Sequence, residues 1–370
     1  MKIAFIGQKG LPAKTGGVER HVEGLVSKLA SAGHEVLVYG QKDYNQPNLV
    51  KDGRVKLINI PSLPLKNLEA IIRTFLSCLD LLRHRVDIIH VQSIGPGSLI
   101  PLLKILKPKT PVVFTFHCQD YHHQKWGRLA RWYLKLGERL GNRYADRVIT
   151  TSHELTAYTG ATYHNDPIYI PNGVFIPDKL AAEEITARWG LNKGSYILWV
   201  GRLVRHKGVQ YLLKAYQEIK TDKKLVIVGA GSYTDDYVQE LYDLAKGNEN
   251  IIFTGNQSGK TLNELFSNAY LLVQPSESEG LSLALLEAMS YGLACIVSDI
   301  TANKEAVAEA GVTFRDKDYQ DLRVKLEQLL KDESLVSELG NKALNRVKHE
   351  YSWDDISQNT LKIYHELLNK

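Results

Sequence analysis

Short apolar runs alternate with longer amphipathic stretches along this chain of 370 residues, and this alternation constrains the fold more than any other feature. The runs are nearly continuous in apolar residues, which is typical of strands buried on both faces of a parallel sheet. The stretch 18–32 predicts a helix that ends at Gly33. In the first half the predicted strands lie at 2–7, 35–40, 87–92, 111–116, 146–150 and 167–172.

The same alternation starts again in the second half of the chain. Two such series predict two Rossmann-like domains of the α/β class, with a boundary near residue 175. We therefore expect one domain over 1–174 and another over 175–352, followed by a last helix from Trp353 with Ser352 as its N-cap. The second set of predicted strands lies at 196–201, 224–229, 250–255, 269–276 and 294–299.

Composition excludes several classes of protein. The mean hydropathy is −0.22 and no apolar run approaches the ~18 residues that span a bilayer. The start, MKIAFIGQKG, predicts a first strand rather than a signal peptide. Cys78, Cys118 and Cys295 lie far apart without a CxxC pair, which argues against a disulfide framework or a zinc site and favours a cytoplasmic protein.

The charge is unevenly distributed along the chain. Residues 1–174 hold 23 Lys and Arg against 13 Asp and Glu, a net +10, whereas the remainder holds 23 against 28, a net −5. The segment 124–143 is basic, with aromatic and Leu residues between the charges, and as a helix it could lie on an anionic membrane beside a lipid-linked acceptor. An ordinary amphipathic surface helix explains it equally well. No motif of a nucleic-acid-binding module is present, so no nucleic-acid partner is expected.

One candidate site lies in the stretch QPSESEGLSLALLEAMSYG, residues 274–292. It predicts a strand, a loop and a helix, and ligands of parallel sheets bind at this carboxyl edge. The first amides of the helix, near Leu281, Ser282 and Leu283, would face a phosphate. Gly280 would let the backbone approach that ligand closely.

Two glutamates accompany this loop. Glu287 falls in a helix that is apolar nearly all round, so we expect it to be buried and to have a partner. That partner is either a structural Arg or Lys or, as we favour, the hydroxyl groups of a ligand. Glu279 lies about two turns earlier in the same loop–helix unit.

A second candidate segment is WVGRLVRHKG, residues 199–208. It follows a predicted strand and brings Arg202 and Lys207 to the same edge, where the two cations could hold a diphosphate. Either residue alone is more often a solvated loop cation, but together with the glutamate loop they favour an anion site.

The first domain offers weaker signals. In KGLPAKTGGVER, residues 9–20, Gly16 and Gly17 at the start of a helix would present bare amides to an anion. The spacing is not GxGxxG and no acid ends the second strand, so a dinucleotide-dependent dehydrogenase is not favoured. In FTFHCQD, residues 114–120, His117 and Asp120 end another strand, and His117 fits either a packing role or a functional one.

Together these motifs resemble the large retaining glycosyltransferase family four. The matching features are GGVER, FTFH, IPNGV at 170–174, VGRLVRHKG, LVIVGAG, and the two glutamates of EGLSLALLE separated by seven residues. The resemblance covers essentially the whole chain and implies the GT-B architecture, in which two Rossmann-like domains face a central cleft. It also implies that the last helix, 353–370, crosses back onto the first domain.

The resemblance implies a role for each candidate residue. Arg202, Lys207 and the amides from Gly280 to Leu283 would bind the diphosphate of a nucleotide-sugar, and Glu287 would hold its ribose hydroxyls. Glu279 would contact the transferred sugar. Gly16 and Gly17 would approach the donor from the other domain, and His117 would lie near the sugar and the acceptor, with Asp120 on the acceptor side. Leu281 and Ser282 stand where the family often has an aromatic residue and a glycine.

The implied activity is transfer of a sugar, with retention, from a nucleotide-sugar to a saccharide or lipid-linked acceptor, in the assembly of a surface polysaccharide or glycolipid. Because cations stabilise the departing diphosphate, neither a metal nor another cofactor is expected. DKD at 316–318 resembles a metal-binding DxD, but Asp318 fits better as a helix N-cap. The alternatives are another GT-B enzyme, such as a sugar-nucleotide epimerase or a phosphorylase, and a non-catalytic partner subunit.

Overall fold

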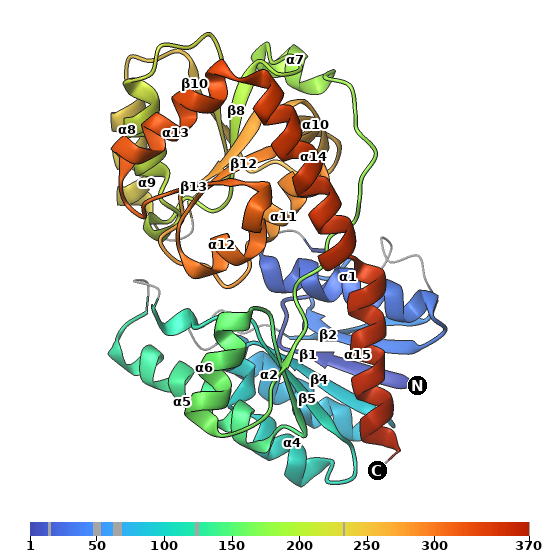
Figure 1. The fold of residues 1–370 in the computed structure, drawn as a ribbon. Helices are drawn as coiled ribbons and strands as arrows, with labels where there is room; N and C mark the ends of the chain where they lie inside the picture. Colours follow the sequence, from blue (N-terminus) through green and yellow to red (C-terminus); the bar gives the residue numbers. More distant parts are fainter. Residues whose placement is uncertain (14–15, 47–52, 62–68, 123–125, 232–233, 370) are drawn as a thin grey trace. The chain divides into compact units, whose positions relative to one another are not determined.

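The computed structural model describes residues 1–369 except 14–15, 47–52, 62–68, 123–125 and 232–233. The chain forms two compact units (Figure 1). Unit 1 comprises Met1–Gly173 and Trp353–Lys370, and unit 2 comprises Val174–Ser352. Residues 124 and 125 of the predicted basic helix fall outside the described residues.

Unit 1 contains a parallel sheet of seven strands in the order β3-β2-β1-β4-β5-β6-β7. Its third strand along the chain, β3, was absent from the sequence prediction. Polar residues interrupt this strand, VKLINI, and it is half-exposed at the sheet edge, so it lacks the apolar run of a central strand. The strands are β1 Lys2–Ile6, β2 Glu35–Gln41, β3 Val55–Ile60, β4 Ile88–Gln92, β5 Val112–Phe116, β6 Arg147–Thr150 and β7 Ile168–Tyr169.

Helices cover both faces of this sheet. One apolar cluster joins the strands to α2, α4, α5 and α6, and a second joins them to α1 and α15. Alternate residues of β1 enter opposite clusters, Ala4 and Ile6 on one face and Ile3 and Phe5 on the other, as the two-residue period of a strand requires. The helices are α1 Gly17–Ser31, α2 Glu69–Asp80, α3 Ile94–Gly97, α4 Ile100–Leu106, α5 Arg128–Tyr144, α6 His153–Tyr163 and α15 Trp353–Leu368.

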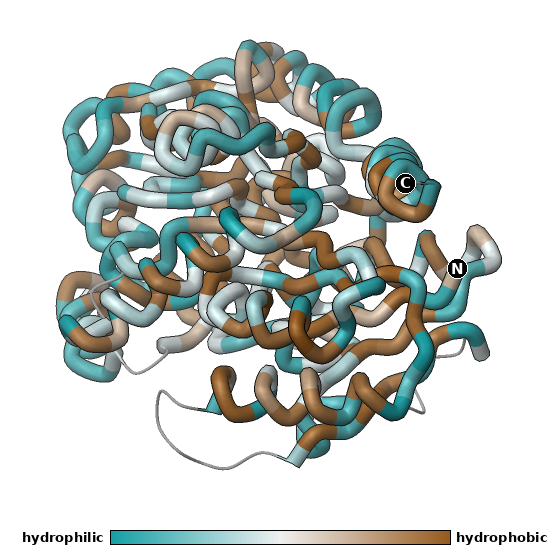
Figure 2. The backbone as a smooth tube through the Cα atoms, turned by 90° about the horizontal axis from the view of Figure 1, so that it is seen from below, coloured by the Kyte–Doolittle hydropathy of each residue, from teal (hydrophilic) through white to brown (hydrophobic). Residues whose placement is uncertain are grey.

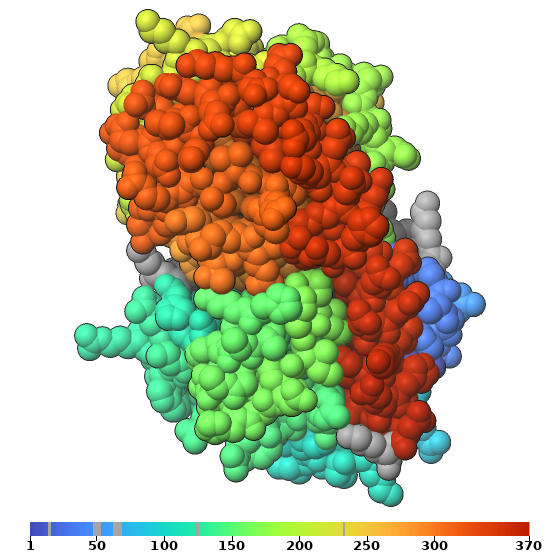
Figure 3. Space-filling view, in the orientation of Figure 1, coloured from blue at the N-terminus to red at the C-terminus, as the bar shows by residue number. Residues whose placement is uncertain are grey.

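The C-terminal helix α15 is part of unit 1, and its outer face stays at the surface (Figure 3). Trp353 at its start is 4% exposed. The indole packs so closely against Gly24 and Gly173 that a Cβ at these glycines would lie 2.2 and 2.5 Å from its atoms. Two distant segments therefore lack side chains at the places where the indole sits.

Unit 2 contains a parallel sheet of six strands in the order β10-β9-β8-β11-β12-β13. The sequence prediction lacked β13, which has three residues and is half-exposed over most of its length. The prediction of two parallel Rossmann-like sheets is otherwise confirmed. The strands are β8 Tyr196–Val200, β9 Lys224–Val228, β10 Ile251–Gly255, β11 Leu271–Gln274, β12 Ala294–Ser298 and β13 Val312–Phe314.

The second sheet is also covered on both faces. One cluster contains residues of α7, α10, α11 and α14, and the other contains residues of α8, α9 and α13. Figure 2 shows apolar and polar residues alternating around the turns of helices, as expected of helices that cover a sheet. The helices are α7 Glu184–Trp189, α8 Val209–Gln217, α9 Asp235–Ala245, α10 Gly259–Asn268, α11 Leu283–Ser290, α12 Thr301–Val307, α13 Tyr319–Lys331 and α14 Glu333–Glu350.

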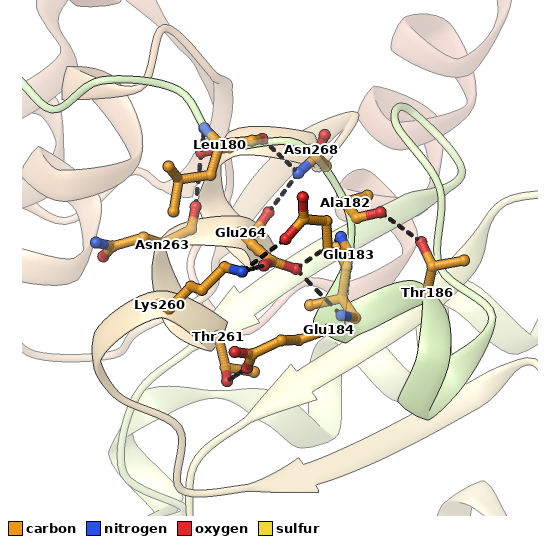
Figure 4. Close-up of polar contacts among 12 residues, drawn as sticks. Leu180, Ala182, Glu183, Glu184, Thr186, Lys260, Thr261, Asn263, Glu264 and Asn268 are labelled. Atoms are coloured by element: carbon orange, nitrogen blue, oxygen red, sulfur yellow. Dashed lines mark hydrogen bonds and ion pairs between the residues drawn. The ribbon is translucent and has the colours of Figure 1, made fainter.

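A buried carboxylate fixes the first part of unit 2 (Figure 4). Glu264 of α10 is fully buried and accepts hydrogen bonds from the backbone N–H groups of Glu183 and Ile185, at 3.0 and 3.2 Å. Burial would raise the pKa of Glu264, but these amide donors and Lys260 lower it below its ordinary value. The carboxylate thus satisfies free amides where α7 begins.

Among the described residues, no helix combines the length and the apolar character that a membrane crossing requires. The three cysteines are free: Cys78 and Cys295 are buried and Cys118 is half-buried.

Candidate active site

Two loops of unit 2 meet at the carboxyl ends of the neighbouring strands β8 and β11. The Nζ of Lys207 lies 2.5 Å from Oε1 of Glu279, although the two residues are 72 positions apart. The backbone N–H of Glu277 donates to the carbonyl of His206 at 2.7 Å. Gly208 has a φ of 74°, and a Cβ there would lie 1.7 Å from the carbonyl oxygen of Pro275. Only glycine lets the two loops come this close.

Glu279 is charged in this setting. Its side chain is 9% exposed and that of Lys207 is 15% exposed. Oε1 of Glu279 also accepts a hydrogen bond from Nε2 of Gln274 at 2.9 Å. Burial alone would raise the pKa of Glu279, but the Lys207 ammonium and hydrogen bonding hold it below its ordinary value. The site therefore holds a lysine and a glutamate that neutralise each other within a poorly hydrated loop.

Arg202 lies on the same loop as Lys207 but differs in exposure. Its side chain is exposed, and no described residue forms an ion pair with it. The backbone around it is firmly held, because the N–H groups of Gly201 and Leu203 donate to the carbonyls of Val228 and Ala230 at the end of β9. The arrangement presents a guanidinium on a fixed backbone, which suits an anionic ligand.

The helix after the glutamate loop begins later than predicted. Ser282 is the N-cap of α11, and its Oγ accepts a hydrogen bond from the N–H of Leu285 at 3.4 Å. The first helical residue is Leu283, so the amides of Gly280 and Leu281 belong to the preceding loop rather than to the helix. A serine is a strong N-cap, and this preference sets the helix start.

Glu287 is half-buried, so its side chain is less enclosed than expected, although its Oε2 is buried. The surrounding helix α11 is buried through Leu285, Leu286, Ala288 and Met289, and Glu287 lies on its remaining face. Burial and the neighbouring Glu287 carboxylate raise the pKa of Tyr291 to about 12. Only part of the Glu287 side chain is exposed, because its Oε2 is buried.

In unit 1, the start of α1 carries a carboxylate that the sequence analysis did not single out. Gly16 is the N-cap, with a φ of 101°, and Gly17 is the first helical residue. Glu19 is buried, and its Oε1 accepts a hydrogen bond from the N–H of Lys9 at 2.9 Å. A Cβ on Gly16 would lie 2.2 Å from Glu19 Oε2. A carboxylate thus lies at the place where an anion was expected.

His117 is held in a buried polar cluster of unit 1. Its Nε2 lies 2.8 Å from Oε1 of Gln92, and its ring packs edge-on to His21 with centroids 4.8 Å apart. His90 is also buried, 2.6 Å from both the Tyr364 hydroxyl and the Thr115 hydroxyl.

The histidines of this cluster are uncharged at neutral pH. Burial, and then the nearby His21 and His90, hold the pKa of His117 well below its ordinary value. Burial likewise lowers the pKa of His21 to about 4, partly offset by a hydrogen bond with Asn172. The pKa of His90 is lowered well below its ordinary value by burial and by His21. His21 and His90 were not predicted as site residues, although a histidine inside the apolar run DIIHVQ was a usable signal.

Two other predicted residues lie apart from this cluster. Asp120 begins the short 3-10 helix η3, Asp120–His122, and its Oδ1 accepts a hydrogen bond from the Cys118 thiol at 3.2 Å. Asp318 caps α13 as predicted, accepting from the N–H groups of Gln320 and Asp321 at 3.0 Å each. Within the described residues, no group of three or more His, Cys, Asp or Glu side chains has the arrangement of a metal site.

Comparison with known proteins gives a consistent result. The uncharacterized glycosyltransferase MJ1607 of Methanocaldococcus jannaschii is 28% identical over 389 residues, covering 98% of each chain. TuaC of Bacillus subtilis, a putative teichuronic acid biosynthesis glycosyltransferase, is 26% identical and covers 72% of this chain and 62% of its own. The crystal structure of Anabaena HepE in complex with UDP-glucose superposes with a TM-score of 0.81 at 18% identity, covering 99% of this chain and all of that one.

Family profiles match both units. Residues 15–176 match Glycosyltransferase Family 4, and residues 182–346 match Glycosyl transferases group 1. These matches, together with the two parallel Rossmann-like sheets, mean that the chain belongs to glycosyltransferase family 4 and has the GT-B fold.

Proposed function

We propose that this protein transfers a sugar, with retention, from a nucleotide-sugar to a saccharide or lipid-linked acceptor in the assembly of a surface polysaccharide or glycolipid. The observation that carries this proposal is the packing of Lys207 against the Glu279 loop that leads into α11, with the exposed Arg202 on the same loop as Lys207. A relative named for teichuronic acid biosynthesis and a structural neighbour bound to UDP-glucose support it.

In this proposal unit 2 binds the donor. Lys207 and Arg202 neutralise the diphosphate, Arg202 as a planar donor of two hydrogen bonds and Lys207 as a point charge. The loop amides at Gly280 and Leu281 and the first helical amides of α11 add dipoles of the same sign. Glu287, which is half-buried rather than enclosed, accepts hydrogen bonds from the ribose hydroxyls.

The chemistry then depends on stabilising the leaving group. As the bond at the anomeric carbon breaks, negative charge grows on the diphosphate, and fixed positive groups stabilise this charge most. The departing phosphate takes the acceptor's proton on the same face of the sugar, so no separate nucleophile is required. The cations make a metal or another cofactor unnecessary in this scheme. Glu279 is ionised beside Lys207. When the diphosphate also binds the Lys207 ammonium, the Glu279 carboxylate would contact the hydroxyls of the sugar.

Unit 1 is the proposed acceptor side, with His117 near the sugar and the acceptor and Asp120 on the acceptor side, whereas Gly16 and Gly17 are proposed to approach the donor. A neutral His117 can accept or donate one hydrogen bond but carries no charge, which suits orientation of a hydroxyl rather than charge stabilisation.

The surface of helix α5 supports the proposal that the acceptor is lipid-linked and lies at the cytoplasmic face of an anionic membrane. Its outer surface exposes Leu129, at 79%, and Trp132, at 61%. Apolar side chains surrounded by cations match an anionic bilayer surface. The exposed cations of this helix are Arg128, Arg131, Lys135, Arg139 and Arg143.

The test of the activity is a panel of UDP-, GDP-, dTDP- and ADP-sugars. We expect one nucleotide class to raise the melting temperature, because a ligand that binds the folded state stabilises it. Incubation of that donor with lipid-linked saccharides should then give a product one sugar larger. An isomerised donor sugar without an acceptor would indicate an epimerase instead, and no stabilisation by any donor would favour a non-catalytic subunit.

The membrane contact is tested by co-sedimentation with phosphatidylglycerol vesicles at low salt. We expect binding by the wild type and a loss of binding in the double variant Leu129→Ser, Trp132→Ser. Val324→Ser changes a 52% exposed residue of unit 2 and is the matched control. Equal binding by the double variant and the wild type would refute the contact.

A further inference from the structure

Glu138 is a buried carboxylate for which the proposed mechanism has no use. It lies on the inner face of α5 and is 1% exposed. Its Oε1 accepts hydrogen bonds from the hydroxyls of Tyr158 and Tyr163, at 2.7 and 2.6 Å. Within the described part of the chain, its Oε2 is buried without a hydrogen-bond partner and no cation pairs with it. A carboxylate in this setting costs stability that an apolar side chain would not.

The two tyrosines act as donors. Burial, followed by hydrogen bonding and the charge of Glu138, raises the pKa of Tyr163 above its ordinary value, so its hydroxyl stays protonated. Tyr163 and Tyr158 both belong to α6, so these bonds join α5 to α6. This part of the arrangement would be sufficient for a purely structural role.

Tyr158 connects Glu138 to a second element. Its hydroxyl oxygen lies 3.4 Å from the hydroxyl oxygen of Tyr121, in η3. Because the single hydroxyl proton of Tyr158 goes to Glu138, Tyr121 has to be the donor in that contact. Nε2 of Gln119 in turn donates to the Tyr121 hydroxyl at 2.7 Å. A directed chain of hydrogen bonds therefore runs from Gln119 through Tyr121 and Tyr158 to the carboxylate.

This chain ends in the loop that follows β5. Gln119 and Tyr121 alternate with Cys118 and Asp120, and His117 immediately precedes them. Nζ of Lys135 on α5 also lies 5.2 Å from the centre of the Tyr121 ring, a second contact between this helix and the loop. The helix itself packs directly against the start of α3, because a Cβ on Gly137 would lie 2.0 Å from the carbonyl oxygen of Ile94.

We propose that Glu138 is a positioning residue that holds the loop 117–122 in one conformation through Tyr158 and Tyr121. The significance of that loop for acceptor binding rests on the proposed function, but the hold on its conformation does not. Tyr163 binds the same carboxylate, and among the described residues no hydrogen bond joins its side chain to the loop. Breaking the Tyr158 bond should therefore loosen the loop, and breaking the Tyr163 bond should not.

The loop contains its own probe. Cys118 is half-buried, whereas Cys78 and Cys295 are fully buried, so a thiol reagent should modify Cys118 first under native conditions. The experiment measures the rate of Cys118 modification by N-ethylmaleimide, by mass spectrometry, in the full-length wild type and in Tyr158→Phe, Tyr163→Phe, Glu138→Ala and Glu138→Gln. Melting curves of each variant report global stability separately.

We expect the rate to rise about fivefold in Tyr158→Phe and Glu138→Ala, the change in open population that the loss of one hydrogen bond produces. We expect a change below about twofold in Tyr163→Phe and in Glu138→Gln, which keeps an acceptor oxygen for Tyr158. Equal rates in Tyr158→Phe and Tyr163→Phe, or an unchanged rate in Glu138→Ala, would overturn the proposal.

The role of the loop in acceptor binding is tested separately, by the KM values for acceptor and donor. For the donor and acceptor pair that the panel of donors identifies, Tyr158→Phe should raise the acceptor KM more than the donor KM, and Tyr163→Phe should raise neither. A raised donor KM alone would contradict the positioning of an acceptor loop. If no donor supports transfer, the proposed function fails, while the labelling rates still decide whether Glu138 holds the loop.

Discussion

The buried histidine cluster of unit 1 makes stability depend on pH in a way that can be worked out. The perturbation is a fall from about pH 7.5 to about pH 5.5, a range in which unfolded histidines take up protons. Folded His21, His90 and His117 have lowered pKa values and remain neutral there. The unfolded state then binds more protons than the folded state. The free energy of unfolding is therefore highest above the pKa of the unfolded histidines and decreases as the pH falls through that pKa.

The magnitude follows from the two pKa values. The pKa of His21 is about 4 in the folded state and 6.5 in the unfolded state. Between about pH 7.5 and about pH 5.5, His21 therefore lowers the free energy of unfolding by about 1.4 kcal/mol. Burial and the neighbouring histidines lower the pKa values of His90 and His117 well below 6.5, so both groups add to this loss in the same direction. Such a loss is a large fraction of the stability of an ordinary domain.

The assay is urea unfolding at both pH values, followed by circular dichroism, in the wild type and in His90→Gln. His90 is a suitable target because it contacts Tyr364 and Thr115 and is not a candidate site residue. The variant should be less stable at pH 7.5 because one hydrogen bond is lost. Between the two pH values it should lose less stability than the wild type, since one group that stays neutral in the folded state is gone.

The control is His349→Gln, which replaces an exposed histidine of α14 and should keep the wild-type pH dependence. A His90→Gln variant whose stability falls with pH as steeply as that of the wild type would refute the reasoning. Ending the range at pH 5.5 keeps the titration of carboxylates such as Glu279 and Glu264 out of the measurement.

Three further outcomes follow from packing. Glu264→Ala should lower the free energy of unfolding by about 3 kcal/mol, because it leaves two buried amides unsatisfied. The control Glu183→Gln changes an exposed side chain and should lower it by less than about 1 kcal/mol, and urea unfolding measures both variants. Gly208→Ala should lower the melting temperature and weaken donor binding, because its Cβ would collide with Pro275, and a variant with wild-type affinity would contradict the close approach of the two loops. Trp353→Ala should cost about 3–5 kcal/mol and expose α15 to hydrogen exchange, and unchanged exchange in 353–368 would refute its anchoring role.

The two parallel sheets could be predicted from the sequence, because their central strands are buried on both faces and are therefore continuously apolar. It failed at β3 and β13, where an edge position allows polar residues or leaves very little strand. Lys207 and Glu279 could be expected near each other because parallel strands bring their carboxyl ends to one edge of the sheet.

Tertiary contacts determine the features that the sequence left open. His90 stands out in an apolar run, but its partner Tyr364 lies 274 residues away, on a helix whose packing the local sequence does not specify. The exposure of Glu287 depends on which face of α11 its neighbours cover. Glu138 gives no local signal at all, because its two tyrosine partners belong to the next helix, α6, and their distances follow only from packing.

The central claim is that Lys207 and its surrounding loops form a diphosphate site. Calorimetric titration of the wild type and Lys207→Met with UDP, GDP, dTDP and ADP tests it directly, with Lys342→Met, which breaks an exposed ion pair with Glu338, as the control. We predict that one nucleotide binds. Lys207→Met should lower its affinity by about 10-fold to 100-fold, the effect of losing one charge-assisted hydrogen bond, and Lys342→Met should leave the affinity unchanged. Equal affinity in Lys207→Met and the wild type, or no binding of any nucleoside diphosphate, would contradict the account.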